Sequence, residues 1–194
     1  AYLKEFLDCL ESDVIISGAG PAGLCAALNL AQEGYKVVVF ERTLRPGGGV
    51  PGGGMMFNKI VIQEEARPLL EELDVTLKPY QENYYVVQAL ELLGALLVKA
   101  IKQGVYLFNC ISVEDVLIYD KKVSGVVINW SAAQAAGLHV DPLTARTKFV
   151  VDATGHAAEV AEIVSRKSGC KLFTSTGKVS EKNLCGPKRG KRSS

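Results

Sequence analysis

Residues 13–41 read DVIISGAGPAGLCAALNLAQEGYKVVVFE, and this stretch decides the fold. It opens on an apolar run that predicts a buried strand, and the glycine turn GAGPAG follows directly. Residues 24–33 predict a helix, and residues 36–40 predict a second buried strand with Glu41 at its carboxyl end. This order predicts a βαβ unit of a parallel sheet.

The spacing of the glycines suits a dinucleotide. Gly18 would form the tight turn, Gly20 would let the backbone approach a pyrophosphate, and Gly23 would allow close packing of helix on strand. The free amides at the helix N-terminus would face the anion, and Glu41 would accept hydrogen bonds from a ribose. A lone glycine triplet is often only a loop, but the two strands, the helix and the spaced acid favour a dinucleotide site.

Length and composition fit one globular domain. The chain has 194 residues, of which 48% are hydrophobic and 22% are charged. No apolar run reaches membrane-spanning length and no secretory signal is visible, so we expect a cytoplasmic protein without a membrane partner. The five cysteines are scattered and form no Cys-x-x-Cys pair, which argues against a zinc ribbon or a disulfide framework.

Basic residues gather at the end of the chain. Residues 178–194 hold six Lys or Arg and one Glu, although the net charge of the whole chain is only +1. A nucleic-acid-binding tail and a solvated terminus both fit this pattern, and the lack of interleaved aromatics favours the second. We therefore expect a single dinucleotide-binding domain at residues 1–170, a poorly ordered or aberrant tail at 171–194, and no nucleic-acid partner.

A glycine-rich loop follows Glu41. Residues 47–54 contain six glycines, which excludes a helix or a central strand. The segment could be a flexible linker or a loop that wraps a ligand. Its place directly after the ribose-binding acid favours the ligand loop.

The remaining elements alternate less regularly. Three successive strands predict a small antiparallel insert on a mostly parallel sheet, with a polar turn at residues 120–122. The expected helices are 59–73, 88–102 and 157–168, and the expected strands are 106–112, 113–119, 123–130 and 147–153.

Three further segments carry a specific resemblance. They are GGGMMFNK at residues 52–59, ISVEDV at 111–116 and GLHVDPLT at 137–144. Together with the glycine turn and the VVDATG strand, they make residues 13–165 resemble the thiamine thiazole synthase family. The resemblance implies an α/β fold of the flavoprotein type, a Rossmann-like FAD/NAD(P)-binding parallel sheet with a small antiparallel insert.

The resemblance also implies an activity. The family consumes NAD as a substrate, condenses its ribose with glycine, and inserts sulfur to give an adenosine diphosphate thiazole, the precursor of thiamine. It assembles into homo-octamers with shared sites. Beside Gly18, Gly20 and Gly23, the implied nucleotide contacts are Ala22, Glu41, Arg42, Gly49, Val113, His139, Val140 and Asp141.

The two histidines and one nearby aspartate are the candidate catalytic residues. His139 and Asp141 lie between Gly137 and Pro142, and His156 follows a glycine at a strand-to-helix switch. Imidazole and carboxylate suit iron(II), manganese or zinc, but the spacing alone favours an ordinary structural role. The resemblance instead assigns iron(II) to Asp141 and His156. Two ligands leave the metal open, so substrate or a neighbouring subunit must complete the site.

The residue at position 139 separates two modes of the family. Some members carry a cysteine there and give up its sulfur, whereas this chain has histidine and no cysteine between Cys110 and Cys170. The resemblance therefore implies the archaeal-type enzyme that takes sulfide from solution. The family also continues into a glycine-binding Arg-Met-Gly-Pro segment, of which residues 186–190 are only a faint echo.

Two other functions stay open. One is a FAD-dependent oxidoreductase that uses the same glycine turn, and the other is a non-catalytic NAD-binding remnant. Related sequences are sometimes labelled ribose-bisphosphate isomerases.

Overall fold

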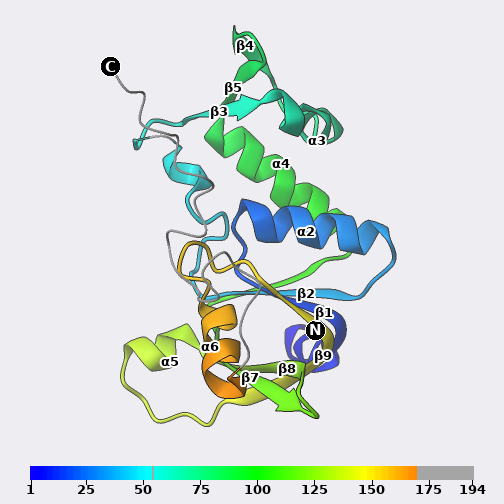
Figure 1. Cartoon of the computed structure of the whole chain (residues 1–194), viewed down its shortest axis with the longest axis vertical. Coiled ribbons are helices and arrows are strands. Elements are labelled where there is room, and N and C mark those ends of the chain that lie inside the picture. The colour runs from blue at the N-terminus through cyan, green and yellow to red at the C-terminus, as the bar shows by residue number, and fades with distance from the viewer. Residues whose placement is uncertain (54, 170–194) are drawn as a thin grey trace.

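The computed structural model describes residues 1–53 and 55–169, and its centre is a six-stranded sheet (Figure 1). The strand order is β6-β2-β1-β9-β8-β7. In that order the strands are Tyr106–Asn109, Val37–Glu41, Glu11–Ser17, Leu143–Asp152, Lys122–Trp130 and Ile111–Tyr119. The first four are mutually parallel, while β8 is antiparallel to β9 and β7 is antiparallel to β8. The predicted α/β class with a mainly parallel sheet is confirmed.

The antiparallel part differs in detail from the prediction. Of the three strands expected between residues 106 and 130, the first is β6, which pairs in parallel with β2. The break between β6 and β7 falls at Cys110, not after Ser112, because Cys110 adopts a left-handed backbone with φ of 59°. The polar turn at Asp120 and Lys121 is confirmed, since both residues have the positive φ of a tight hairpin.

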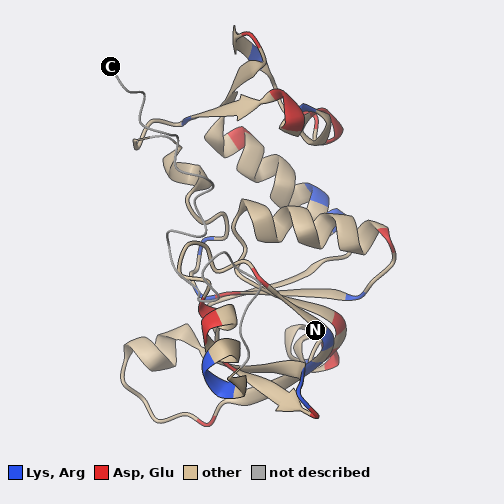
Figure 2. Ribbon diagram, viewed as in Figure 1, with Lys and Arg blue, Asp and Glu red and all other residues tan. Residues whose placement is uncertain are grey.

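The helices lie on both faces of the sheet. The helices α2 and α4 pack together on one face, and α2 carries no charged residue (Figure 2). The helices are α1 Tyr2–Asp8, α2 Pro21–Gln32, α3 Arg67–Glu72, α4 Ala89–Lys102, α5 Ser131–Ala135 and α6 Glu159–Ser168, with short 3₁₀ turns η1 Val50–Gly52 and η2 Glu64–Ala66.

Strand periodicity divides the core into two clusters. On β1, Val14 and Ile16 face the cluster of α2 and α4, whereas Ile15 belongs to the opposite cluster with Phe6 of α1 and Phe108 of β6. Successive side chains of a strand point to opposite faces, so a continuous apolar run fills both. This is why residues 14–16 are apolar without a break.

A second, three-stranded sheet corrects the helix predicted at residues 59–73. Its order is β3 Lys59–Gln63, β5 Tyr84–Gln88, β4 Lys78–Gln81, and all pairs are antiparallel. Only residues 67–72 form a helix, α3. Ile60 and Ile62 are half-buried while their neighbours are exposed, a period of two that pairing with β5 imposes.

The predicted basic tail at 171–194 and the segment at 186–190 lie outside the described residues, so the domain division at residue 170 stays a prediction. Within the described part of the chain, no helix is both long enough and apolar enough to cross a membrane.

Candidate nucleotide-binding site

The glycine turn lies where three parallel strands end. Ser17, the last residue of β1, is level with Phe40 of β2 and with Asp152 of β9. The amide of Gly18 donates to the Phe40 carbonyl (2.8 Å), and the amide of Ala153 donates to the Ser17 carbonyl (2.9 Å). The order in which strands are added to the sheet switches sides at β1, because β2 and β9 flank it on opposite sides, and ligands of α/β sheets bind at such a switch point.

The three fingerprint glycines have different surroundings. A Cβ on Gly18 would lie 2.5 Å from the Ala153 carbonyl oxygen, and one on Gly23 would lie 2.1 Å from the Gly18 carbonyl oxygen. A Cβ on Gly20 would meet no protein atom within 4 Å. The protein itself therefore explains glycine at positions 18 and 23, whereas open space lies beside Gly20 at the start of α2, where free amides favour an anion.

Glu41 ties the glycine turn to the end of β2. The residue is only 7% exposed, and its Oε2 accepts a hydrogen bond from the Ala19 amide (2.8 Å). Its Oε1 accepts from the amide (2.8 Å) and the hydroxyl (2.7 Å) of Thr43. A carboxylate has about four acceptor positions, so Glu41 keeps capacity for a ribose hydroxyl while its position is fixed by the protein.

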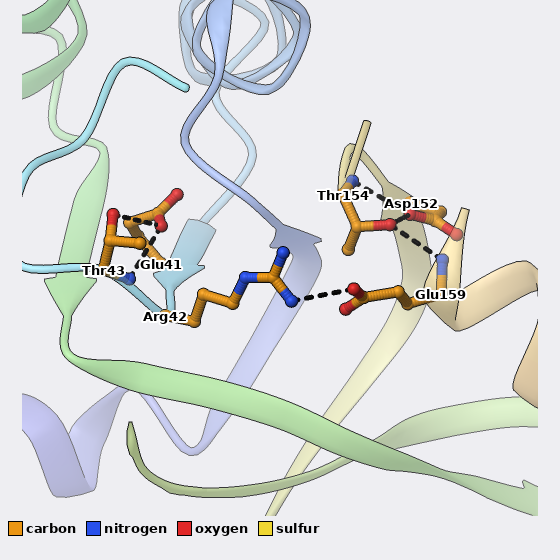
Figure 3. A network of polar contacts seen from close by, with 6 residues as sticks. All are labelled: Glu41, Arg42, Thr43, Asp152, Thr154 and Glu159. Carbon is orange, nitrogen blue, oxygen red and sulfur yellow. Dashed lines mark hydrogen bonds and ion pairs between the residues drawn. The ribbon is translucent and has the colours of Figure 1, made fainter. Parts of the chain in front are cut away.

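Arg42 links the end of β2 to the start of α6, which follows β9. Its side chain reaches across the end of β1 to Glu159 at the start of α6, with 2.7 Å between Nη1 and Oε1 (Figure 3). Both side chains are more than a third exposed, so the ion pair itself adds little stability. The guanidinium is thereby held beside the glycine turn, where it could meet a phosphate bidentately.

The start of α6 is fixed by residues that our sequence reasoning did not single out. Asp152 accepts from the amide (3.0 Å) and hydroxyl (2.6 Å) of Thr154, and from the Ala161 amide (2.8 Å). The Thr154 hydroxyl in turn accepts from the Glu159 amide (2.8 Å; Figure 3). An Asp and a Thr just before a helix are a recognisable capping signal. They hold both ends of the turn that carries His156.

The glycine-rich loop also comes to the start of α2. A Cβ on Gly48 would lie 3.2 Å from Cα of Gly20, so the two backbones nearly touch. Pro21, Gly49 and Val50 line one side of a cleft of about 490 Å³, and Gly53 and the first residues of β3 line the rest. The structure thus brings Gly49 beside the turn of Gly20 and Ala22, which supports a ligand loop over a free linker.

Val113 is half-buried on β7, near the start of that strand and soon after the end of β6. The Cys110 amide donates to the Thr43 carbonyl (3.3 Å), and Asn109 Nδ2 donates to the Leu44 carbonyl (2.7 Å). These bonds place the start of β7 beside the residues that follow Glu41. The contact of Val113 with an adenine stays a prediction.

The candidate catalytic residues fall into two places. His156 is exposed in the turn after β9, at the same edge of the sheet as the glycine turn. His139, Val140 and Asp141 are exposed in the loop that precedes β9. The ten residues of β9 separate the two places by about 30 Å at ~3.3 Å per residue. Within one chain, Asp141 and His156 therefore cannot bind the same metal ion.

Neither place alone has a full set of metal ligands. Among the described residues, no three His, Cys, Asp or Glu side chains form a group that could hold a metal. One carboxylate and one imidazole are suitable donors for iron(II), but each chain presents them at opposite ends of a strand. The donor types fit iron(II), and a site that used both residues would need them from two copies of the chain.

Comparisons with solved structures support this fold. A crystal structure of Thermovibrio ammonificans THI4 superposes with a TM-score of 0.85 at 42% identity, covering 88% of this chain and 68% of that chain. L-proline dehydrogenase from P. horikoshii matches with a TM-score of 0.61 at 17% identity, covering 81% of this chain and 56% of that chain, and shows a shared fold only.

Sequence comparisons agree. A protein named thiamine thiazole synthase from Methanothermobacter thermautotrophicus is 48% identical over 178 residues, covering 92% of this chain and 69% of the relative. A protein of the same name from Pyrococcus abyssi is 48% identical over 167 residues, covering 86% of this chain and 66% of the relative. The chain thus spans about two thirds of the length of these curated relatives. The model of the Thi4 family matches residues 1–186, and the chain therefore belongs to this family, whose relatives here are named thiamine thiazole synthase.

Proposed function

We propose that this chain is a thiamine thiazole synthase that makes an adenosine diphosphate thiazole from NAD, glycine and sulfide with the help of iron(II). The observation that carries the proposal is the switch point at the carboxyl ends of β1, β2 and β9 in a chain of the Thi4 family. Glu41, Arg42, the amides of α2 and the Gly49 loop lie at or beside this edge of the sheet and would together bind one elongated ligand.

The residues at this switch point match the parts of NAD. The N-terminal amides of α2 would bind the pyrophosphate beside Gly20, where no protein atom fills the space. Glu41 would accept hydrogen bonds from the adenosine ribose, and Arg42 would neutralise a phosphate. His156 lies in the turn after β9, on the other side of β1 from Glu41, so it would be near the nicotinamide ribose.

The catalytic set would be completed between copies of the chain. Asp141 of one copy and His156 of another would hold iron(II), because β9 keeps the two residues of one chain about 30 Å apart. Once bound there, iron(II) would supply a Lewis acid that holds sulfide next to the sugar. His139 lies two residues from Asp141 and could move a proton at the same place.

The sulfur source follows from the residue at position 139. Histidine cannot donate sulfur, and the chain has no cysteine between Cys110 and Cys170. External sulfide is therefore the proposed donor, and the enzyme would turn over repeatedly.

Complementation between two inactive variants tests the shared site. Asp141→Asn and His156→Asn should each abolish thiazole formation and lower iron content. An equal mixture that is coexpressed should recover about a quarter of the activity and of the bound iron, because random pairing rebuilds that share of sites.

The control is the doubly substituted chain Asp141→Asn/His156→Asn, mixed with either single variant. It carries neither ligand, so no mixture of this kind can rebuild a site. Full activity of either single variant, or no recovery in the mixture of the two, would contradict a site shared between copies.

The nucleotide that copurifies with the protein tests the substrate. Mass spectrometry should find an adenylated thiazole or a glycine adduct of ADP-ribose. Anaerobic incubation with NAD, glycine, sulfide and ferrous iron should then give several products per chain. Bound FAD would instead favour an oxidoreductase, and bound NAD without any turnover would favour a non-catalytic remnant.

A further inference from the structure

The strand β3 is an outer strand of the small sheet, and among the described strands only β5 pairs with it. The Ala89 amide donates to the Asn58 carbonyl (3.1 Å), and the Glu64 amide donates to the Asn83 carbonyl (3.0 Å). Backbone hydrogen bonds of an antiparallel pair alternate along a strand. The even-numbered residues of β3 therefore bond to β5, and the amides and carbonyls of Val61 and Gln63 point away from it. Within residues 1–53 and 55–169, no strand pairs with this outer edge.

Within the described residues, neither a proline nor a covering strand blocks pairing at this edge. The other outer strand, β4, has four residues and contains Pro79, which cannot donate a backbone hydrogen bond. By contrast β3 has five residues and no proline, and the Val61 side chain is 53% exposed. Open edges of this kind are templates for strand addition.

The charges along this segment are self-complementary. β3 begins with Lys59, and Glu64 and Glu65 follow its last residue, so the segment is basic at its start and acidic beyond its end (Figure 2). Lys59 and Glu65 are both exposed. An antiparallel copy of the same segment would bring opposite charges together at both ends.

We propose that β3 pairs antiparallel with β3 of a second copy of this chain, across a two-fold axis at Ile62. In this register Val61 exchanges both backbone hydrogen bonds with Gln63 of the second copy, and Gln63 does the same with its Val61. Lys59 then lies beside η2 of the second copy, the turn that carries Glu65. The small sheets of the two copies become one continuous sheet.

The open amides allow any register whose two-fold axis passes through a residue, because odd-numbered residues then lie opposite odd-numbered residues. Among these registers, the axis at Ile62 is the one that brings Lys59 next to Glu65 of the second copy. A contact across a two-fold axis needs a patch that is complementary to itself, and a segment with Lys59 at one end and Glu65 at the other meets this need. Pairing with a strand of another protein would not require opposite charges at the two ends. The second copy is therefore the occupant that this edge fits.

The contact is separate from the one that would join Asp141 and His156. The small sheet lies at the end of the molecule opposite the loop of residues 137–142 (Figure 1). The assembly of β3 edges and the shared metal site can thus be tested independently.

Gln63→Pro tests the pairing. The Gln63 amide points to the open edge, and its φ of −86° is close to that of proline, so β3 should still pair with β5. We expect light scattering to show an assembly of half the wild-type mass, or a dissociation constant raised at least about tenfold. Gln63→Ala is the matched control, because it keeps the amide and should keep the wild-type mass.

A charge exchange provides a second test that needs no proline. Lys59→Glu and Glu65→Lys should each weaken assembly, and the double variant should restore it. If Gln63→Pro fails to fold, as judged by circular dichroism, this exchange decides the question. A wild-type chain that stays monomeric, an unchanged mass of folded Gln63→Pro, or no restoration in the double variant would overturn the pairing.

The two proposals fail separately. Recovery of activity by mixed Asp141→Asn and His156→Asn chains reports the shared metal site, whereas the mass of Gln63→Pro reports the β3 edge. If only one of the two experiments gives its expected outcome, the contact tested by the other experiment is the wrong one.

Discussion

Gly18, Gly20 and Gly23 share one motif, but each is glycine for a different reason. Gly18 has a φ of 102°, and a Cβ there would meet the Ala153 carbonyl. Gly23 has no room because its Cα faces the Gly18 carbonyl. Gly20 has an ordinary φ of −72° and open space beside it. The first two shape the turn, and the third leaves room for a ligand.

Substitution by alanine should separate these roles. Gly23→Ala should lower the free energy of unfolding by about 1–3 kcal/mol, because a Cβ at 2.1 Å from the Gly18 carbonyl oxygen forces α2 away from β1. Gly20→Ala should change stability by about 1 kcal/mol or less and weaken binding of ADP-ribose at least tenfold. Urea denaturation and calorimetric titration measure the two effects. If the two variants were equally stable and lost ADP-ribose binding to the same extent, the two glycines would not have separate roles.

At the scale of elements, the end of β9 and the start of α6 behave as one unit. Asp152 on the strand and Thr154 in the turn accept the amides that the helix leaves free. The N-cap residue Ala158 has no side chain that can accept these amides, and its backbone is left-handed with φ of 45°. The position of His156 therefore depends on the strand as much as on the helix.

Thr154→Val should show this dependence. The substitution keeps the shape but removes the hydroxyl that bonds both Asp152 and the Glu159 amide, so unfolding should become easier by about 1–2 kcal/mol. The His156 ring resonances should shift in NMR spectra. Thr154→Ser keeps the hydroxyl and is the control. A Thr154→Val chain as stable as Thr154→Ser would show that this cap is unimportant.

For the whole molecule, Asp13 connects segments that are far apart in the sequence. It accepts a hydrogen bond from Lys148 Nζ on β9 (2.7 Å) and one from the Lys36 amide just before β2 (3.0 Å). The hydrogen bond from Lys148, with that from the Lys36 amide, holds the pKa of Asp13 below its ordinary 3.8. The carboxylate thus helps to hold β1 between its two parallel neighbours.

This shift predicts a pH dependence. Because the folded-state pKa of Asp13 is lowered, its contribution is present above the unfolded pKa of 3.8 and is lost as pH falls through the folded value. Asp13→Asn should therefore be less stable than the wild type at pH 7, with the difference shrinking below about pH 4. Thermal unfolding at both pH values measures it. A difference that is unchanged at pH 3 would contradict this reading.

The sequence alone determined the βαβ unit and its ligand edge. Residues 14–16 and 37–40 are apolar at every position because both faces of these strands are buried, and the glycines mark where backbone meets backbone. Such signals are local, so they can be read without the fold. The Asp–Ala–Thr cap before α6 was equally local and could have been found in the same way.

Only the tertiary structure decided the small sheet and the arrangement of the candidate catalytic residues. Ile60, Val61 and Ile62 suit a helix or a strand, and pairing with β5 made them a strand. His139 and Asp141 lie close to His156 in the sequence, yet an extended strand places them far apart, since each residue of β9 adds about 3.3 Å. Separation along the chain does not fix separation in space. A segment that pairs with neighbouring strands is extended, whereas the same number of residues in a helix or a turn would be much shorter.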